Sequence, residues 1–144
     1  MAFMGHLVTA ARVAVLAIGL SSLTMKFAST VFRVAAVWGV LVLAPLFFMF
    51  DGSGVTGNPP FTYLQAYFGF LCVTLAWQLA FWVIGSDPVR FRPLMVPAMV
   101  EKFGFVLALT VLYMQGRVGP SEVLPAVPDF VLGALFVAAY AKTR

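Results

Sequence analysis

Four polar side chains lie within long apolar stretches of this chain, where polar groups are costly. Arg33, Gln78 and the adjacent pair Glu101–Lys102 each have hydrophobic residues on both sides. An ionisable group inside a lipid bilayer costs several kcal/mol unless it has a partner or a water-filled cavity. These residues are therefore the first candidates for chemistry, which would be the transfer of a proton, an ion or a polar substrate.

Arg33, Gln78 and Glu101 lie at similar depths in three different apolar stretches. Each is about seven or eight residues from the end of its stretch, and at 1.5 Å per residue this is about 10 to 12 Å. We expect one buried polar cluster, in which Glu101 pairs with Arg33 and Gln78 bridges or caps the pair. Three interpretations stay open: the pair only fixes helix packing, it lines a path for a proton, ion or substrate, or the two residues do not touch.

Two further residues are secondary candidates, Lys102 and Asp129. Lys102 is about 100° around a helix from Glu101, so we expect the two to face different partners and Lys102 to extend towards the headgroups. Asp129 follows Pro128, a residue type favoured at the first helical position. An acid in the first turn is stabilised by the helix dipole. We expect this helix-start role for Asp129, with a functional acid as the alternative.

The sequence lacks the patterns of most familiar active sites. Paired intramembrane histidines, CxxC, zinc-site, P-loop and G-x-S-x-G patterns are absent, and His6 is the only histidine. Lys and Arg are scattered at the ends of apolar stretches and do not cluster on one face, which argues against a nucleic-acid partner. We therefore expect no catalytic residues, no metal and no cofactor, and the protein is predicted not to be an enzyme.

Composition indicates that lipid is the solvent for most of the chain. Of its 144 residues 62% are hydrophobic and 10% charged, and the mean hydropathy is +1.02. Soluble domains carry about 25% charged residues. The apolar stretches are continuous over about 20 residues, as in membrane-spanning helices, whereas barrel strands alternate in polarity over about 10 residues. The expected fold class is an all-α membrane protein, a four-helix transmembrane bundle.

The apolar stretches predict four spans, over about 28–50, 63–85, 93–115 and 124–141. The segments between them contain the helix breakers Gly and Pro. Basic residues precede the first span, separate the second from the third and follow the fourth, whereas residues 51–60 contain none. The positive-inside rule then predicts an antiparallel bundle with both termini cytoplasmic, as a multi-pass protein of the inner (cytoplasmic) membrane.

Residues 1–24 do not fit this plan, and they are treated separately from a transmembrane domain over 25–144. Three interpretations stay open: an extension upstream of a natural start at Met25, a signal-like leader, or an amphipathic or partly inserted helix. A fifth span over 7–23 would need Arg12 in the bilayer and a tight turn at 24–27.

Three stretches, LAWQLAFWVIGSDPVRFRPLMVPAMVEKFGF, VLYMQGRV and DFVLGALFVAAYAKTR, carry a family resemblance. They resemble a group of small, uncharacterised bacterial inner-membrane proteins with four predicted helices. The likeness covers most of 25–144, and those relatives typically begin with a Met-Lys pair, as at Met25. The plan is similar to that of DoxX-like four-helix proteins, by analogy only. The resemblance implies a fold and a compartment, and it transfers no site residues.

The expected function is that of a small, non-enzymatic accessory or interaction protein of the membrane. One alternative is a small oligomeric transporter or channel that uses Glu101 and Arg33. Small four-helix multidrug transporters carry their essential acid in the first helix, where this chain has Arg33 and no acid. Another alternative is a binder of a lipid or quinone near Trp38 and Trp77. The expected partners are the lipid bilayer and either further copies of the chain or a larger membrane complex.

Overall fold

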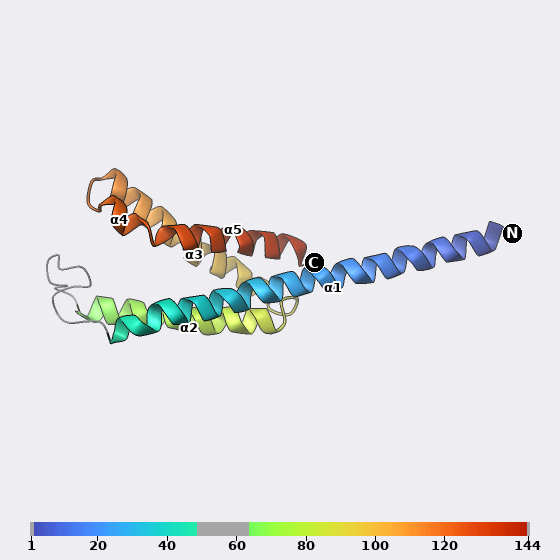
Figure 1. The fold of residues 1–144 in the computed structure, drawn as a ribbon, viewed down its shortest axis with the longest axis horizontal. Helices are drawn as coiled ribbons and strands as arrows, with labels where there is room; N and C mark the ends of the chain where they lie inside the picture. Colours follow the sequence, from blue (N-terminus) through green and yellow to red (C-terminus); the bar gives the residue numbers. More distant parts are fainter. Residues whose placement is uncertain (1, 49–63, 144) are drawn as a thin grey trace.

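The computed structural model describes residues 2–48 and 64–143, and these are almost entirely helical (Figure 1). In chain order the elements are α1 (Ala2–Leu43), the 3₁₀ helix η1 (Ala44–Phe47), α2 (Leu64–Ser86), α3 (Arg92–Met114), α4 (Pro120–Val123) and α5 (Ala126–Lys142). Four segments are long and apolar enough to cross a membrane, namely Gly19–Phe47, Gln65–Ser86, Arg92–Met114 and Pro120–Lys142. The predicted all-helical class and the number of spans are confirmed for the described residues.

The first helix is much longer than its predicted span. α1 is continuous over 42 residues, and its upstream half projects beyond the other helices (Figure 1). The Thr24 hydroxyl donates to the carbonyl of Ser21 at 2.9 Å, so the polar residues here are accommodated within the helix. The tight turn that a separate fifth span would need at 24–27 is not formed. The division of the chain at residue 24 and the status of the leader stay predictions.

The last turn of the first span is tightened around Pro45, which has no backbone N–H to donate. α1 therefore passes into η1, which ends at Phe47. The predicted end of this span, residue 50, lies outside the described residues. The fourth span also begins earlier than expected, since the short helix α4 starts at Pro120.

α1 and α2 pack closely because small residues lie between them. The Ser29 hydroxyl donates to the carbonyl of Gly85 at 2.6 Å, and Gly39 lies directly against the Gln78 side chain. At the other end of the pair, the Tyr67 hydroxyl donates to the carbonyl of Leu46 at 3.0 Å. Small residues let helix backbones approach closely, as they commonly do in membranes.

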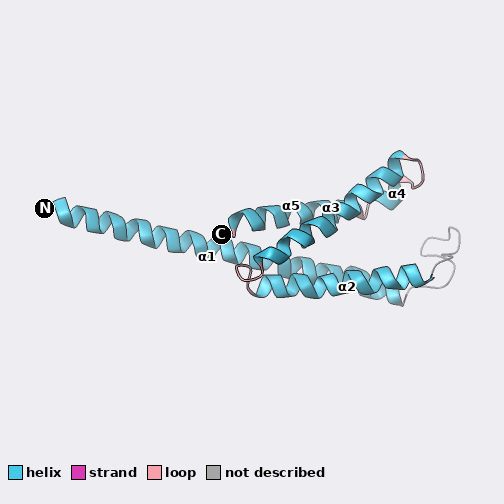
Figure 2. Ribbon diagram, turned by 180° about the vertical axis from the view of Figure 1, so that it is seen from behind, coloured by secondary structure: helices cyan, strands magenta, loops and turns pink. Residues whose placement is uncertain are grey.

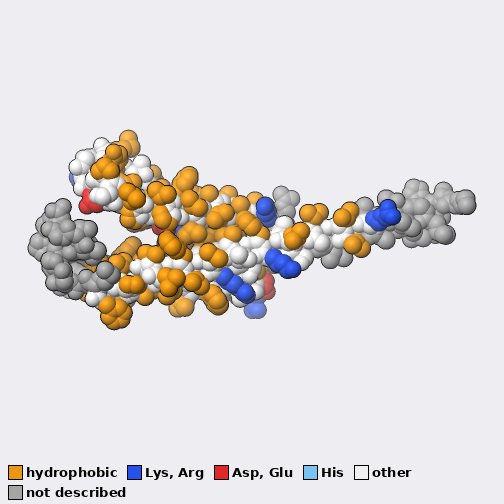
Figure 3. All heavy atoms as spheres, viewed as in Figure 1, with side chains coloured by type: hydrophobic (Ala, Val, Ile, Leu, Met, Phe, Trp, Pro, Cys, Tyr) orange, Lys and Arg blue, Asp and Glu red, His pale blue; other side chains and the backbone are white. Residues whose placement is uncertain are grey.

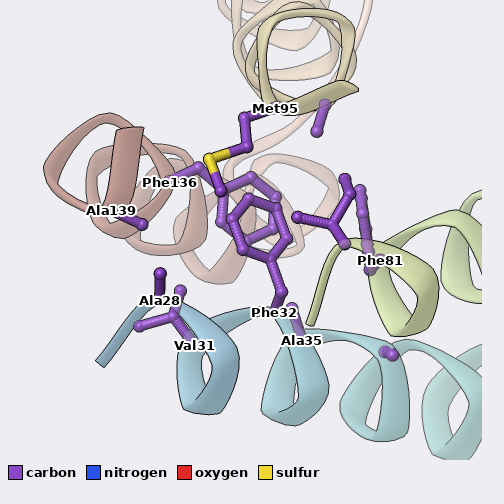
Figure 4. Packing of buried hydrophobic residues seen from close by; sticks show 11 residues of the cluster. Ala28, Val31, Phe32, Ala35, Phe81, Met95, Phe136 and Ala139 are labelled. Carbon is purple, nitrogen blue, oxygen red and sulfur yellow. The ribbon is translucent and has the colours of Figure 1, made fainter. Parts of the chain in front are cut away.

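α3 and α5 form the second pair, and the four long helices meet in an aromatic and aliphatic core (Figure 4), close to the point beyond which α1 projects alone (Figure 1). The rings of Phe32 and Phe136 stack at 4.2 Å between centroids, and Phe81 packs edge-on against Phe136 at 5.1 Å. All three side chains are fully buried. Further from this core, the α1–α2 pair and the α3–α5 pair diverge (Figures 1 and 2). The molecule is thus two helix pairs joined through one aromatic centre.

Gly85 is expected to tolerate a methyl group poorly. A Cβ at this position would lie 3.1 Å from the carbonyl oxygen of Ser29 and 3.2 Å from the backbone nitrogen of Arg33. Because backbone atoms cannot rotate away, Gly85→Ala should reduce the free energy of unfolding by about 1–3 kcal/mol. The control is Gly104→Ala, where a Cβ meets nothing within 4 Å. Unfolding in mixed micelles measures both, and equal effects for the two variants would contradict the close packing.

Candidate functional site

Lys102 is the centre of a charged network between α3 and α5. Its ammonium nitrogen lies 2.9 Å from Oδ1 of Asp129 and 3.3 Å from Oε2 of Glu101. Lys102 is buried, with 6% of its surface exposed, and its Nζ is 5.4 Å from the ring centroid of Phe81 on α2. The network therefore touches both helix pairs, next to the aromatic core.

The helices place these three residues by their register. Arg92, near the start of α3, lies over the ring of Tyr140, near the end of α5, at 4.0 Å. Further along α3, Phe103 packs against the ring of Phe130. Lys102 consequently lies opposite the first turn of α5, which contains Asp129. The helix-start position predicted for Asp129 is confirmed, although α5 begins at Ala126 and not at Pro128.

The charges of the network do not balance. One ammonium group faces two carboxylates, and Oε2 of Glu101 is a buried atom without a hydrogen-bond donor among the described residues. The side chains of Glu101 and Asp129 are 17% and 20% exposed, although Oε2 of Glu101 itself is buried. The network lies inside the candidate span Arg92–Met114, where charge is costly. The network can therefore accept one further hydrogen bond or bind one further positive charge.

The predicted pair of Arg33 and Glu101 is wrong. Both ion pairs formed within 2–48 and 64–143 involve Lys102. Arg33 is exposed, and its guanidinium lies over the ring of Trp82 on α2 at 5.8 Å from the centroid. Equal depth does not place two groups on facing sides of a bundle. Arg33 lies beside the end of α2, whereas Glu101 lies between α3 and α5.

Gln78 is buried as expected, with 3% of its surface exposed, but it does not bridge an ion pair. Its side-chain nitrogen donates to the carbonyl of Thr74 at 2.8 Å, one turn back on α2. The amide group of Gln78 thus forms a hydrogen bond within its own helix, and it packs against Gly39 of α1. Gln78 is therefore a packing residue of the α1–α2 pair.

The expectation that Lys102 would extend to the headgroups is also wrong. Adjacent residues point about 100° apart on a helix, but the long side chains of Lys102 and Glu101 bend together over this angle. The sequence predicted a helix-start role for Asp129, with a functional acid as the alternative, but not its ion pair with Lys102. The available signal was the presence of opposite charges in the third and fourth spans.

Basic side chains gather where α2 ends, α3 begins and α5 ends (Figure 3). Two of them form cation–π contacts with aromatic rings. Arg92 lies over the ring of Tyr140, and Nζ of Lys142 is 4.5 Å from the ring centroid of Phe27. We call this set the basic belt; its members are Lys26, Arg33, Arg90, Arg92 and Lys142. The belt lies close to the core, where the upstream part of α1 leaves the other helices.

Within the described ranges, no three His, Cys, Asp or Glu side chains are grouped so as to hold a metal ion. Lys102, Glu101 and Asp129 thus form the candidate site, an intramembrane ion network without metal-binding geometry. Comparisons of the chain with models of protein families, with curated proteins and with solved structures find no match.

Proposed function

We propose that this protein is a non-enzymatic, multi-pass membrane protein that assembles with further transmembrane helices, either those of another copy or those of a larger complex. The single observation that carries this proposal is the unbalanced charge around Lys102. When both carboxyl groups are ionised, two of them beside one ammonium group leave one negative charge within a membrane-spanning segment. A partner helix with a basic or hydrogen-bonding side chain would offset the cost of that charge.

The divergence of the two helix pairs supports the same proposal. Buried residues shared by all four helices lie near the basic belt, and away from it the pairs separate (Figure 2). The charged network lies next to this core, where the separation begins, because Lys102 contacts Phe81. A partner helix between the pairs would reach Glu101 and Asp129, whose side chains are partly exposed.

The orientation is part of the proposal. We propose an antiparallel bundle in the inner membrane, with both termini and the loop between α2 and α3 in the cytoplasm. The basic belt supports this arrangement, since Lys and Arg are enriched in cytoplasmic loops. Labelling of single cysteines placed at Arg90 and at Arg117 measures sidedness. Labelling of both from the cytoplasm, or of residue 90 only from outside, would contradict the orientation.

A second candidate function is transport of a proton or small cation through the same network. Oε2 of Glu101 favours it, because this atom accepts no hydrogen bond among the described residues and could accept a proton or contact a cation. The proposed carrier is then Glu101 with Lys102 and Asp129, in place of the Glu101–Arg33 pair.

Glu101→Gln separates the two candidate functions. Removing the excess charge should weaken assembly at least tenfold, because the partner loses its ionic contact. Native mass spectrometry in mild detergent measures the assembled fraction, with Glu122→Gln, an exposed position outside the network, as the control. If assembly is intact in Glu101→Gln but proton flux into proteoliposomes is lost, the transport candidate replaces the first. A monomeric wild-type protein without flux would contradict both.

A further inference from the structure

Two shallow apolar grooves lie side by side on α1, the first on its outer face and the second where α1 packs against α2. Arg33, Val34, Val37, Trp38 and Leu41 line the first, which has a volume of about 340 Å³. The second has a volume of about 220 Å³, and its lining includes Val37, Leu41 and Trp82. Val37 and Leu41 line both grooves, so the grooves are adjacent and these two side chains form the ridge between them.

Arg33 provides the charged end of this surface. Its side chain is exposed, and no carboxylate in 2–48 or 64–143 lies within ion-pair distance of it. The guanidinium lies over Trp82, whose side chain lines the second groove, so the cation is near both channels. Arg33 is a member of the basic belt and packs against Gly85, the last residue but one of α2. Its guanidinium is therefore near the level at which α2 leaves the membrane.

We propose that this surface binds one anionic phospholipid. The guanidinium of Arg33 binds the headgroup phosphate through paired hydrogen bonds, the geometry in which arginine recognises phosphate. The two acyl chains lie in the two grooves, one on each side of the ridge formed by Val37 and Leu41. Charge complementarity selects this occupant, because an exposed cation beside aliphatic channels matches a molecule with an anionic head and two tails.

This site is separate from the network proposed for assembly, which lies between α3 and α5. It requires that the chain spans a membrane, but it does not require a partner protein. The groove with Trp38 does not include Trp77, which packs against Phe81 in the core. The site therefore differs from the expected binding site between the two tryptophans.

Quenching of Trp38 fluorescence by brominated lipids tests the proposal. The full chain with Trp77→Phe and Trp82→Phe, reconstituted in phosphatidylcholine nanodiscs, keeps Trp38 as its only tryptophan. We expect brominated phosphatidylglycerol to quench Trp38 about five times more effectively than brominated phosphatidylcholine at the same mole fraction, since one basic residue near the surface contributes about this factor. Arg33→Gln should remove the preference, and Arg33→Lys should keep part of it.

The matched control is Arg90→Gln, which removes an exposed member of the basic belt outside the grooves and should leave the preference intact. Helical circular dichroism and the melting temperature verify that each variant is folded. Equal quenching by the two lipids, or a preference that survives Arg33→Gln, would overturn the proposal. Loss of the preference on adding inorganic phosphate would assign Arg33 to a free anion instead. Disulfide cross-linking of two Val34→Cys chains, with Trp38 shielded from both lipids, would assign the surface to a second copy.

Discussion

Lys102→Met is expected to reduce the free energy of unfolding by about 3–5 kcal/mol, the cost of breaking a buried ion pair by removing one partner. Methionine keeps most of the length of the lysine side chain but removes the charge. Asp129 then loses its 2.9 Å contact, and two carboxylates face each other inside a span without a cation. Unfolding in mixed micelles, followed by helical circular dichroism, measures the loss.

A neutral network should recover most of this stability. Lys102→Met combined with Glu101→Gln and Asp129→Asn leaves no buried charge, and neutral replacements of buried ion pairs are often well tolerated. Lys142→Met is the control, because that side chain is exposed. If Lys102→Met unfolds at the same denaturant concentration as Lys142→Met, the network does not stabilise the α3–α5 pair.

Phe81→Ala is expected to cost about 3–5 kcal/mol, as is usual for a fully buried phenylalanine. Its ring contacts Phe136 at 5.1 Å and Phe32 at 6.2 Å between centroids, and it lies beside Lys102. The substitution removes one of the aromatic contacts that join the two helix pairs and leaves the stacked rings of Phe32 and Phe136. The free energy of unfolding in mixed micelles gives the size of the effect.

The matched control on α2 is Phe70→Ala, because 48% of the Phe70 surface is exposed. Its loss should cost less than about 1 kcal/mol, since surface substitutions usually have small effects. Phe81→Ala should also weaken the coupling between Phe32 and Phe136, which a double-mutant cycle in both backgrounds measures. Equal costs for Phe81→Ala and Phe70→Ala would mean that the aromatic core does not join the pairs.

The sequence was sufficient to predict the helices because length and continuity of apolar residues determine them. α2 and α3 begin and end within two residues of the predicted spans 63–85 and 93–115. The first helix was predicted less well. The sequence suggested a separate segment before residue 25, but α1 continues through it, and hydroxyl side chains can bond to the backbone of their own helix, as Thr24 does.

The candidate site could be predicted only in part. The burial of Gln78 and the partial burial of Glu101 could be predicted from their positions in apolar stretches. Which charges meet depends on the rotation of each helix about its axis and on which helices are neighbours. The depth of a residue along its span gives no information on either. Arg33 and Glu101 have similar depths but lie in different helix pairs. Lys102 and Asp129 meet because α3 and α5 are neighbours, with Arg92 beside Tyr140 setting their register.

The continuity of α1 has a mechanical consequence. A helix of 42 residues is about 63 Å long, about twice the hydrocarbon thickness of a bilayer. Phe32 of the core and the projecting upstream half belong to this one rod, so neither can tilt without the other. A tilt of about 10° at Phe32 moves the start of α1, roughly 45 Å away along the helix, by about 8 Å. α1 is therefore a lever, through which a force on residues 2–24 acts directly on the contact between the two helix pairs.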